Sequence, residues 1–244
     1  MEPIQAKTLV LENGNSLRFV TVPNSLALAS PALEGTDLES GVYEGGLKVW
    51  DCSLDLVRFV GARPGLTRGK RVLELGCGQG LPGIAALQFG QAATLTLQDF
   101  NKEVLDCATG PCLDLNGVDK DRVRLVHGSW ATVAAQLGKH DLILMSETLY
   151  NPEYYEQLVA CIDAALSEEE GAEVVIGTKT FYYGVGGGYY EFQKYLEGEG
   201  GFTLEVVEKI NDMKSIERLI LRMKRENRGR VEKEESREED SFQL

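Results

Sequence analysis

The segment VLELGCGQG, residues 72–80, decides the fold, because an apolar strand runs there into three glycines at alternate positions and then into a helix beginning near Leu81. Glycine lets the backbone turn sharply and approach a ligand where a side chain would collide. The spacing is G-x-G-x-G and lacks the later glycine of the dinucleotide fingerprint, which sets a pyrophosphate on a helix N-terminus. S-adenosylmethionine has no phosphate and needs only a close turn, so we expect it as the cofactor.

Two carboxylates flank this turn. Asp99 ends the next predicted strand, LTLQDF, where it can accept hydrogen bonds from both hydroxyls of a ribose. Glu74 stands two residues before the first glycine, Gly76, and is expected either near the cofactor's ammonium or in a hydrogen bond that only orders the turn. A glycine turn followed by an acidic strand end in one βαβ unit predicts a nucleotide site that includes Glu74, Gly76, Gly78 and Asp99.

Outward from this unit, apolar runs of strand length alternate with segments of helical period, the order that builds a parallel sheet covered by helices. The seven predicted strands are residues 71–76, 93–98, 122–127, 141–146, 173–178, 203–208 and 215–222. We therefore expect a three-layer, Rossmann-like α/β fold. Two helices are expected to turn these residues to the core: Tyr155, Leu158, Val159, Ile162, Ala165 and Leu166 in one, and Tyr189, Phe192, Tyr195 and Leu196 in the other.

The two ends of the chain fall outside this repeating pattern. Residues 1–43 are predicted to form an arm with a short hairpin, since LVLEN and LRFVTV flank Gly14 and Asn15. Residues 224–244 carry many charges of both signs and few apolar side chains, so we expect a disordered tail. One catalytic domain, residues 44–223, lies between them.

Composition narrows the possible partners and cellular locations. The net charge of −13 disfavours direct contact with a nucleic-acid backbone and favours a basic partner, although acidity serves solubility in many proteins. No run of 18 apolar residues and no signal-peptide pattern occurs, so we expect a soluble, monomeric protein of the cytoplasm and nucleus that does not contact membranes. The five cysteines contain no C-x-x-C pair, and we expect no metal site and no disulfide framework.

Three further residues are assigned to the cofactor. Trp130, in the GSW sequence after the third sheet strand, has a broad indole face on which a flat base can stack, and the alternative is a core position on the following helix. Asn101, just after the second strand, and Ser146, at the end of the fourth, complete this half of the predicted site.

Four blocks of sequence resemble the protein-histidine N-methyltransferase branch of the methyltransferase-like proteins. They are residues 44–59 (EGGLKVWDCSLDLVRF), 72–87 (VLELGCGQGLPGIAAL), 142–155 (LILMSETLYNPEYY) and 179–188 (KTFYYGVGGG). The first two blocks are shared with protein-lysine methyltransferases, and the last two distinguish the histidine branch from them. The resemblance implies a class I methyltransferase fold with an antiparallel last strand. It also implies Trp50 in a lid over the cofactor, and methylation of the distal (tele) nitrogen of a histidine in a large-subunit ribosomal protein.

The candidate catalytic residues follow the fourth strand, in the pattern S-E-T-x-Y-N that is typical of the histidine branch. Glu147, Tyr150 and Asn151 are expected at the sheet edge where open α/β folds place substrates. Neutral histidine needs no strong base, only a group that accepts a hydrogen bond from its proximal N–H and leaves the distal nitrogen bare. We expect Glu147 or Asn151 to do this, unless Glu147 caps the next helix and Asn151 only orders the turn before Pro152.

Three other functions remain open from sequence: a lysine methyltransferase, a small-molecule methyltransferase, or a catalytically silent protein that binds the cofactor and a ribosomal protein. The glycine-rich residues 182–188 are expected to form a flexible loop at the substrate rim.

Overall fold

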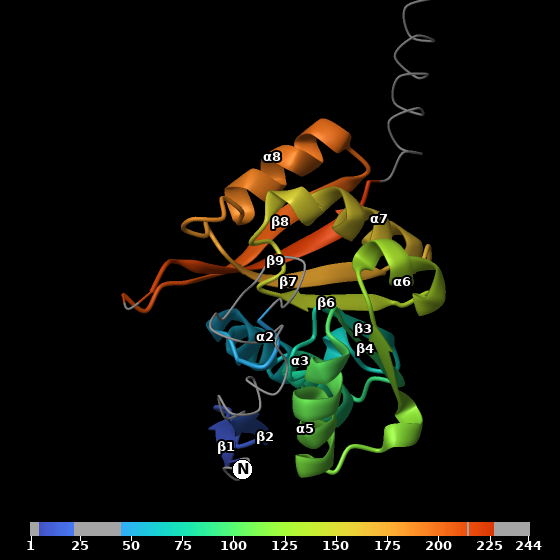
Figure 1. Ribbon diagram of the computed structural model, residues 1–244, viewed down its shortest axis with the longest axis vertical. Helices are drawn as coiled ribbons and strands as arrows, with labels where there is room; N and C mark the ends of the chain where they lie inside the picture. Colours follow the sequence, from blue (N-terminus) through green and yellow to red (C-terminus); the bar gives the residue numbers. More distant parts are fainter. Residues whose placement is uncertain (1–4, 22–44, 214, 227–244) are drawn as a thin grey trace, which may run out of the picture.

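A computed structural model of the chain describes residues 5–21, 45–213 and 215–226. These residues form a seven-stranded sheet with helices on both faces (Figure 1). The strands are β3 (Arg71–Leu75), β4 (Thr94–Asp99), β5 (Val123–His127), β6 (Leu142–Ser146), β7 (Glu173–Lys179), β8 (Phe202–Ile210) and β9 (Arg218–Arg225). Their order in space is β5-β4-β3-β6-β7-β9-β8. Strands β3 to β7 are parallel and β9 is antiparallel to both neighbours, which confirms the predicted fold.

Helices cover both faces because the central strands are apolar on both. Strand β6, LILMS, is buried along nearly its whole length, as expected for a parallel strand packed on two sides. Successive side chains alternate, so Val72 joins one hydrophobic cluster and Leu73 the other. The helices are α2 (Asp51–Gly61), α3 (Leu81–Gln88), α4 (Lys102–Val104), α5 (Gly110–Leu115), α6 (Trp130–Leu137), α7 (Tyr155–Ala165) and α8 (Tyr189–Glu199).

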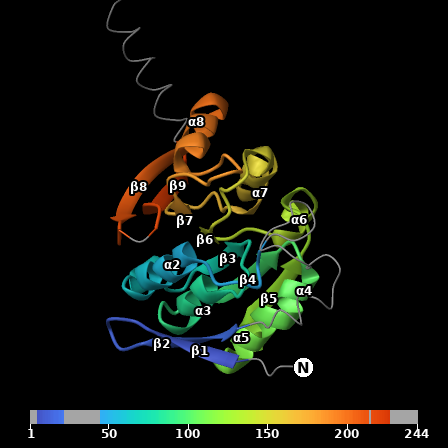
Figure 2. The ribbon, with the colours of Figure 1, turned by 60° about the vertical axis from the view of Figure 1, so that its left-hand side comes forward.

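The two clusters assign the helices to their faces. Helices α2, α3 and α5 contribute to the first cluster and α6, α7 and α8 to the second, on opposite sides of the sheet (Figures 1 and 2). The predicted core-facing stripes of α7 and α8 are confirmed. Tyr155, Leu158, Ile162, Phe192 and Leu196 are buried. The other predicted members, Val159, Ala165, Leu166, Tyr189 and Tyr195, are buried in the second cluster or pack against it.

The N-terminal hairpin is the antiparallel pair β1 (Gln5–Val10) and β2 (Ser16–Thr21), and it lies beside α5 and α3 (Figure 2). Gln79, in the glycine turn, anchors it: its Oε1 accepts from the Val20 amide at 3.1 Å and its Nε2 donates to the Val20 carbonyl at 2.9 Å. The hairpin is therefore attached to the loop that carries Gly76 and Gly78. The rest of the predicted arm, residues 1–4 and 22–43, lies outside the described residues, as does residue 44.

The last two strands differ from their predicted limits. Strand β8 runs from Phe202 to Ile210 instead of 203–208, and β9 begins at Arg218, three residues later than predicted. The reason is local, because the Arg218 guanidinium binds Asp212 and Ser215 and so keeps Ser215 in the connecting turn. Strand β9 continues to Arg225, past residue 223, and residues 227–244 of the predicted tail lie outside the described residues. None of the described helices is long and apolar enough to cross a membrane.

Candidate active site

A cavity of about 240 Å³ opens at the carboxyl ends of the parallel strands, the edge at which open α/β sheets bind ligands. Its wall includes most of the predicted site residues: Trp50, Gly76, Gly78, Asp99, Trp130, Ser146, Glu147 and Tyr150. Strands β3 and β4 supply one side, and β6 and β7 with the start of α2 supply the other. The cavity therefore joins the predicted cofactor half and the predicted acceptor half.

The glycine turn supplies bare backbone to this wall. Gly76 and Gly78 have φ of 61° and 51°, in the left-handed region that favours glycine. A Cβ on Gly76 would lie 2.8 Å from Thr148 Cγ2, and one on Gly78 would lie 3.0 Å from the Gly46 carbonyl oxygen. The turn thus needs glycine for its conformation and for its close packing, and it leaves room for a ligand against the main chain.

Asp99 and Gln98, at the end of β4, hold the turn in place. The Asp99 carboxylate accepts from the Gly78 amide at 2.8 Å and from the Asn101 amide at 3.2 Å. Gln98 Oε1 accepts from the Gly76 amide at 3.2 Å and from Trp130 Nε1 at 3.0 Å. Gln98, which the sequence analysis did not assign, therefore fixes both the first glycine and the indole. In the sequence, the only sign of this role was a polar side chain, Gln98, near the end of an otherwise apolar strand.

Trp130 begins α6 and lines the cavity. Its ring meets Tyr154 edge to face, with 6.5 Å between the centroids. With the Gln98 bond at one side and Tyr154 at another, the indole is fixed as a flat wall. This arrangement suits the stacking role that was expected of it.

Glu74 and Asn101 lie away from the described wall of the cavity. The Glu74 side chain is fully buried under α3, where Oε2 accepts from the Gly83 amide at 2.7 Å. Its Oε1 has no hydrogen-bond partner among the described residues. Burial raises the pKa of this carboxyl well above its usual value, and the Asp99 charge adds to the shift. The Glu74 bond reaches an amide in the first turn of α3, the helix that follows the glycine turn, and the side chain is not on the described cavity wall. Asn101 precedes α4 and reaches Asp99 through its backbone amide.

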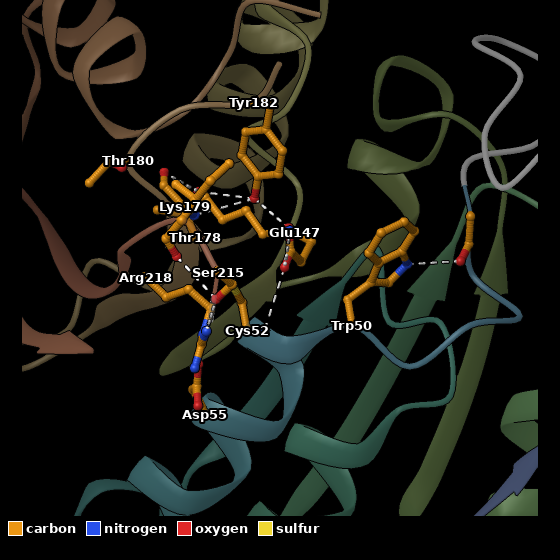
Figure 3. A network of polar contacts seen from close by, with 12 residues as sticks. Trp50, Cys52, Asp55, Glu147, Thr178, Lys179, Thr180, Tyr182, Ser215 and Arg218 are labelled. Atoms are coloured by element: carbon orange, nitrogen blue, oxygen red, sulfur yellow. Dashed lines mark hydrogen bonds and ion pairs between the residues drawn. The ribbon is translucent and has the colours of Figure 1, made fainter. Parts of the chain in front are cut away.

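Trp50 stands immediately before α2 on the cavity wall (Figure 3). Its Nε1 donates to the Gly45 carbonyl at 3.1 Å, which fixes the ring relative to the preceding loop. Two ammonium groups lie over the indole: Lys48 Nζ is 4.5 Å from its centroid and Lys179 Nζ is 5.6 Å away. The Trp50 ring is therefore in contact with two cations and forms part of the cavity wall.

The Glu147 carboxylate is the centre of a polar network in the acceptor half (Figure 3). It accepts from the Tyr182 hydroxyl at 2.6 Å, from Lys179 Nζ at 3.1 Å and from the Cys52 amide, in the first turn of α2, at 3.4 Å. Burial raises the pKa of Tyr182 well above its usual value, and the Glu147 charge raises it further. The Tyr182 hydroxyl therefore stays protonated and donates to the carboxylate.

The backbone places Glu147 in an unusual conformation. Its φ is 56°, in the left-handed region that non-glycine residues rarely adopt, and its amide donates to the Gly177 carbonyl at 2.9 Å. Such conformations are concentrated at functional sites, where the surrounding structure holds them. This turn directs the side chain across β7 toward Lys179 and not toward α7, so Glu147 does not cap the following helix.

Tyr150 and Asn151, although adjacent in sequence, lie in different surroundings. Tyr150 lines the cavity and meets Tyr182 edge to face at 6.4 Å. Asn151 is buried, and its Oδ1 accepts from the Glu153 amide at 3.0 Å, which orders the turn at Pro152. Asn151 does not belong to the described cavity wall, so the geometry favours Glu147 over Asn151 as the group that meets a substrate.

Lys179 and Tyr182, like Gln98, line the cavity but were not assigned to the site from sequence. Lys179 ends β7, and Tyr182 begins the predicted rim loop, which occupies the expected place beside the cavity. The far end of this loop is bound to the β6–α7 connection, since the Gly187 and Gly188 amides donate to the Tyr150 and Leu149 carbonyls. Because β7 is parallel to β6, the ends of both strands meet at one edge, and that rule was the available signal for Lys179.

Comparison with known proteins agrees with this geometry. Residues 36–182 match the family model described as lysine methyltransferase. The chain belongs to this family. Curated relatives include the histidine protein methyltransferase 1 homologues of Dictyostelium discoideum, 40% identical over 74% of this chain and 58% of the relative, and of Rattus norvegicus, 36% identical over 77% and 59%. The predicted resemblance to the histidine branch is confirmed. This chain spans less than two thirds of the length of these relatives.

A solved structure supports the fold assignment. A Streptococcus mutans protein described as a candidate SAM-dependent methyltransferase superposes with a TM-score of 0.60 at 16% identity, covering 92% of this chain and 57% of that one. At this identity the likeness concerns the fold alone. The chain thus has the fold of class I, S-adenosylmethionine-dependent methyltransferases.

Proposed function

We propose that this chain transfers the methyl group of S-adenosylmethionine to the distal (tele) nitrogen of a histidine side chain in a large-subunit ribosomal protein. One observation carries the proposal: the Glu147 carboxylate, on a side chain that is 8% exposed, stands on the wall of the same cavity as the glycine turn. The names of the curated relatives support histidine as the acceptor.

The cofactor half fits S-adenosylmethionine. Gly76 and Gly78 line the cavity with main chain alone, Asp99 is placed to accept from ribose hydroxyls, and Trp130 offers a flat face to adenine. Trp50 would close the methionine end. When bound, the cofactor supplies an electrophilic methyl carbon on a sulfonium. The protein's part is to hold a nucleophile in line with that carbon and to exclude water.

Glu147 would select the reactive form of the substrate. A hydrogen bond from the proximal N–H of neutral imidazole to this carboxylate leaves the lone pair of the distal nitrogen free to attack. As the nitrogen–carbon bond forms, the ring becomes a cation, and the nearby carboxylate stabilises the developing charge. Lys179 and Tyr182 hold Glu147 in position, and loss of the proximal proton afterwards yields neutral methylhistidine.

Charge supports a basic partner. With a net charge of −13, the chain attracts basic proteins such as ribosomal proteins and repels nucleic-acid backbones. We accordingly propose a monomeric enzyme that acts in the cytoplasm and nucleus on the free ribosomal protein, without direct contact with nucleic acid or membrane. In the described residues, no group of three or more potential metal ligands lies together, and the proposed reaction uses none.

Lysine methylation is the second candidate, because the matching family model is described as lysine methyltransferase. A lysine acceptor, with an ordinary pKa near 10.4, must lose a proton before it attacks, whereas histidine near 6.5 is already mostly neutral at pH 7. A lysine acceptor therefore requires a group that removes its proton, whereas a histidine acceptor requires only a group that orients the neutral ring.

The test is transfer of labelled methyl groups into an extract of cells that lack this protein, with ribosomal subunits separated from other proteins before peptide mass spectrometry. The proposal expects label on histidine in a large-subunit protein. Label on lysine would favour the second candidate, and label on histidine elsewhere would reject the ribosomal substrate. Cofactor binding without any transfer would indicate a silent binding protein.

A further inference from the structure

The acceptor half of the cavity already contains an ammonium group. Lys179 Nζ lies 3.1 Å from the Glu147 carboxylate, 5.2 Å from the centroid of the Tyr182 ring and 5.6 Å from that of Trp50 (Figure 3). A carboxylate flanked by aromatic faces is the arrangement by which proteins bind alkylammonium ions. Here the ion that occupies it belongs to the protein itself.

Lys179 is held in this place by the fold. It is the last residue of β7, and its own amide lies 3.4 Å from the Tyr182 hydroxyl oxygen, which accepts from it. The Lys179 side chain is 16% exposed and that of Glu147 is 8% exposed, so neither ion is well hydrated. An uncompensated charge at such a position is costly, and the pair is therefore expected to persist when a substrate enters.

We propose that Lys179 excludes lysine side chains from the acceptor site and so makes the enzyme select histidine. This inference rests on the proposed function. A substrate ammonium that entered would meet the like charge of Lys179, and the Glu147 charge that could compensate it is already paired. A neutral imidazole adds no charge when it binds, and its ring becomes cationic only as the sulfonium loses its charge, so the total charge of the site does not rise.

Binding of side-chain analogues tests the exclusion without any methyl transfer. Both tryptophans of the chain, Trp50 and Trp130, line the cavity, so intrinsic fluorescence reports on it directly. With S-adenosylhomocysteine filling the cofactor half at about pH 8.5, butylamine is charged and 4-methylimidazole is neutral. The wild-type protein should bind 4-methylimidazole at least about tenfold more tightly than n-butylammonium. Equal or tighter binding of n-butylammonium by the wild type would overturn the proposal.

Variants then test the residue itself. Lys179→Met keeps the length of the side chain and removes the charge, which frees Glu147, and its n-butylammonium affinity should rise at least about tenfold. Lys179→Arg keeps the charge, so its n-butylammonium affinity should stay as weak as that of the wild type. Lys194→Met, on the exposed face of α8, is the matched control. A folded Lys179→Met protein with wild-type affinities for both analogues would contradict the proposal.

Methyl transfer provides the second readout. In the same cell extract, hydrolysed to amino acids, Lys179→Met should raise the ratio of methyllysine to methylhistidine at least about tenfold, and Lys179→Arg should not. If the wild type forms methylhistidine and Lys179→Met leaves the ratio unchanged, this inference fails and the proposed function stands. If the wild type forms no methylhistidine but excludes n-butylammonium, the proposed function fails and the exclusion stands.

Discussion

Glu74 and Glu147 lie near the carboxyl ends of the neighbouring strands β3 and β6, but Glu74 is fully buried whereas Glu147 lines the cavity, and their hydrogen-bond partners differ. Glu74 has one partner, the Gly83 amide, and burial raises its pKa. Glu147 has an ammonium, a hydroxyl and an amide around it. The first carboxyl supports a turn and the second is placed for chemistry. Position on a strand thus locates a carboxyl, while its partners determine what it can do.

Replacement of Glu147 by glutamine should produce the largest effect. Glu147→Gln keeps the shape but removes the charge that would stabilise the imidazole cation, so kcat should fall by at least about 100-fold. The unpaired Lys179 should also lower the free energy of unfolding by up to about 3 kcal/mol. Steady-state kinetics, calorimetric binding of S-adenosylhomocysteine and urea unfolding measure these quantities, with cofactor affinity expected within about threefold of the wild type.

The same substitution at position 74 is the control for this experiment. Glu74→Gln removes a carboxyl from another buried site at the same edge of the sheet, and kcat should stay within about threefold of the wild type. Equal losses of kcat in the two variants would contradict a catalytic role that belongs to Glu147 and not to Glu74.

Removal of the Tyr182 hydroxyl should have an intermediate effect. Tyr182→Phe deletes the 2.6 Å hydrogen bond to Glu147 and keeps the ring that packs against Tyr150. A bond to a charged group contributes about 1.5–3 kcal/mol, so kcat should fall about tenfold or more while KM changes little. Tyr183→Phe, on the exposed neighbouring side chain, is the matched control and should retain wild-type kinetics. Wild-type kcat in Tyr182→Phe would remove Tyr182 from the support of Glu147.

The smallest effect is a pH dependence of stability at Glu74. Its pKa is raised in the folded state, so the unfolded chain ionises first as the pH rises above about 4.5, and the wild type then loses stability that it has at lower pH. The Glu74→Gln protein lacks this titration. Urea unfolding at intervals between pH 4 and 7 should therefore show the variant gaining stability relative to the wild type as the pH rises. The opposite slope would mean that burial does not raise the pKa of Glu74.

Much of the fold followed from local pattern. The apolar runs predicted seven strands, and the glycine turn with Asp99 predicted which edge of the sheet carries the site, because both signals depend on neighbouring residues. The predicted start of β9 was wrong because the Arg218 contacts with Asp212 and Ser215 keep Ser215 in the folded turn. The pattern of apolar and polar residues along the chain does not predict such side-chain contacts.

The site was harder to predict for the same physical reason. Glu147 meets Lys179 and Tyr182 across 32 and 35 residues of sequence, and Gln98 meets Trp130 across 32. Only the parallel sheet brings these residues together. The roles of Glu74 and Asn151 could be narrowed to two each from sequence, but choosing between them required the hydrogen bonds to Gly83 and Glu153.

The identity of the methylated atom distinguishes the proposed reaction from lysine methylation. The direct measurement is chromatography of amino acids from hydrolysed extract protein, after the wild-type chain has transferred labelled methyl groups from S-adenosylmethionine. The account predicts label in tele-methylhistidine, because Glu147 is expected to bind the proximal N–H and leave the distal nitrogen free. Label in methyllysine, or in histidine methylated on the proximal nitrogen, would contradict it.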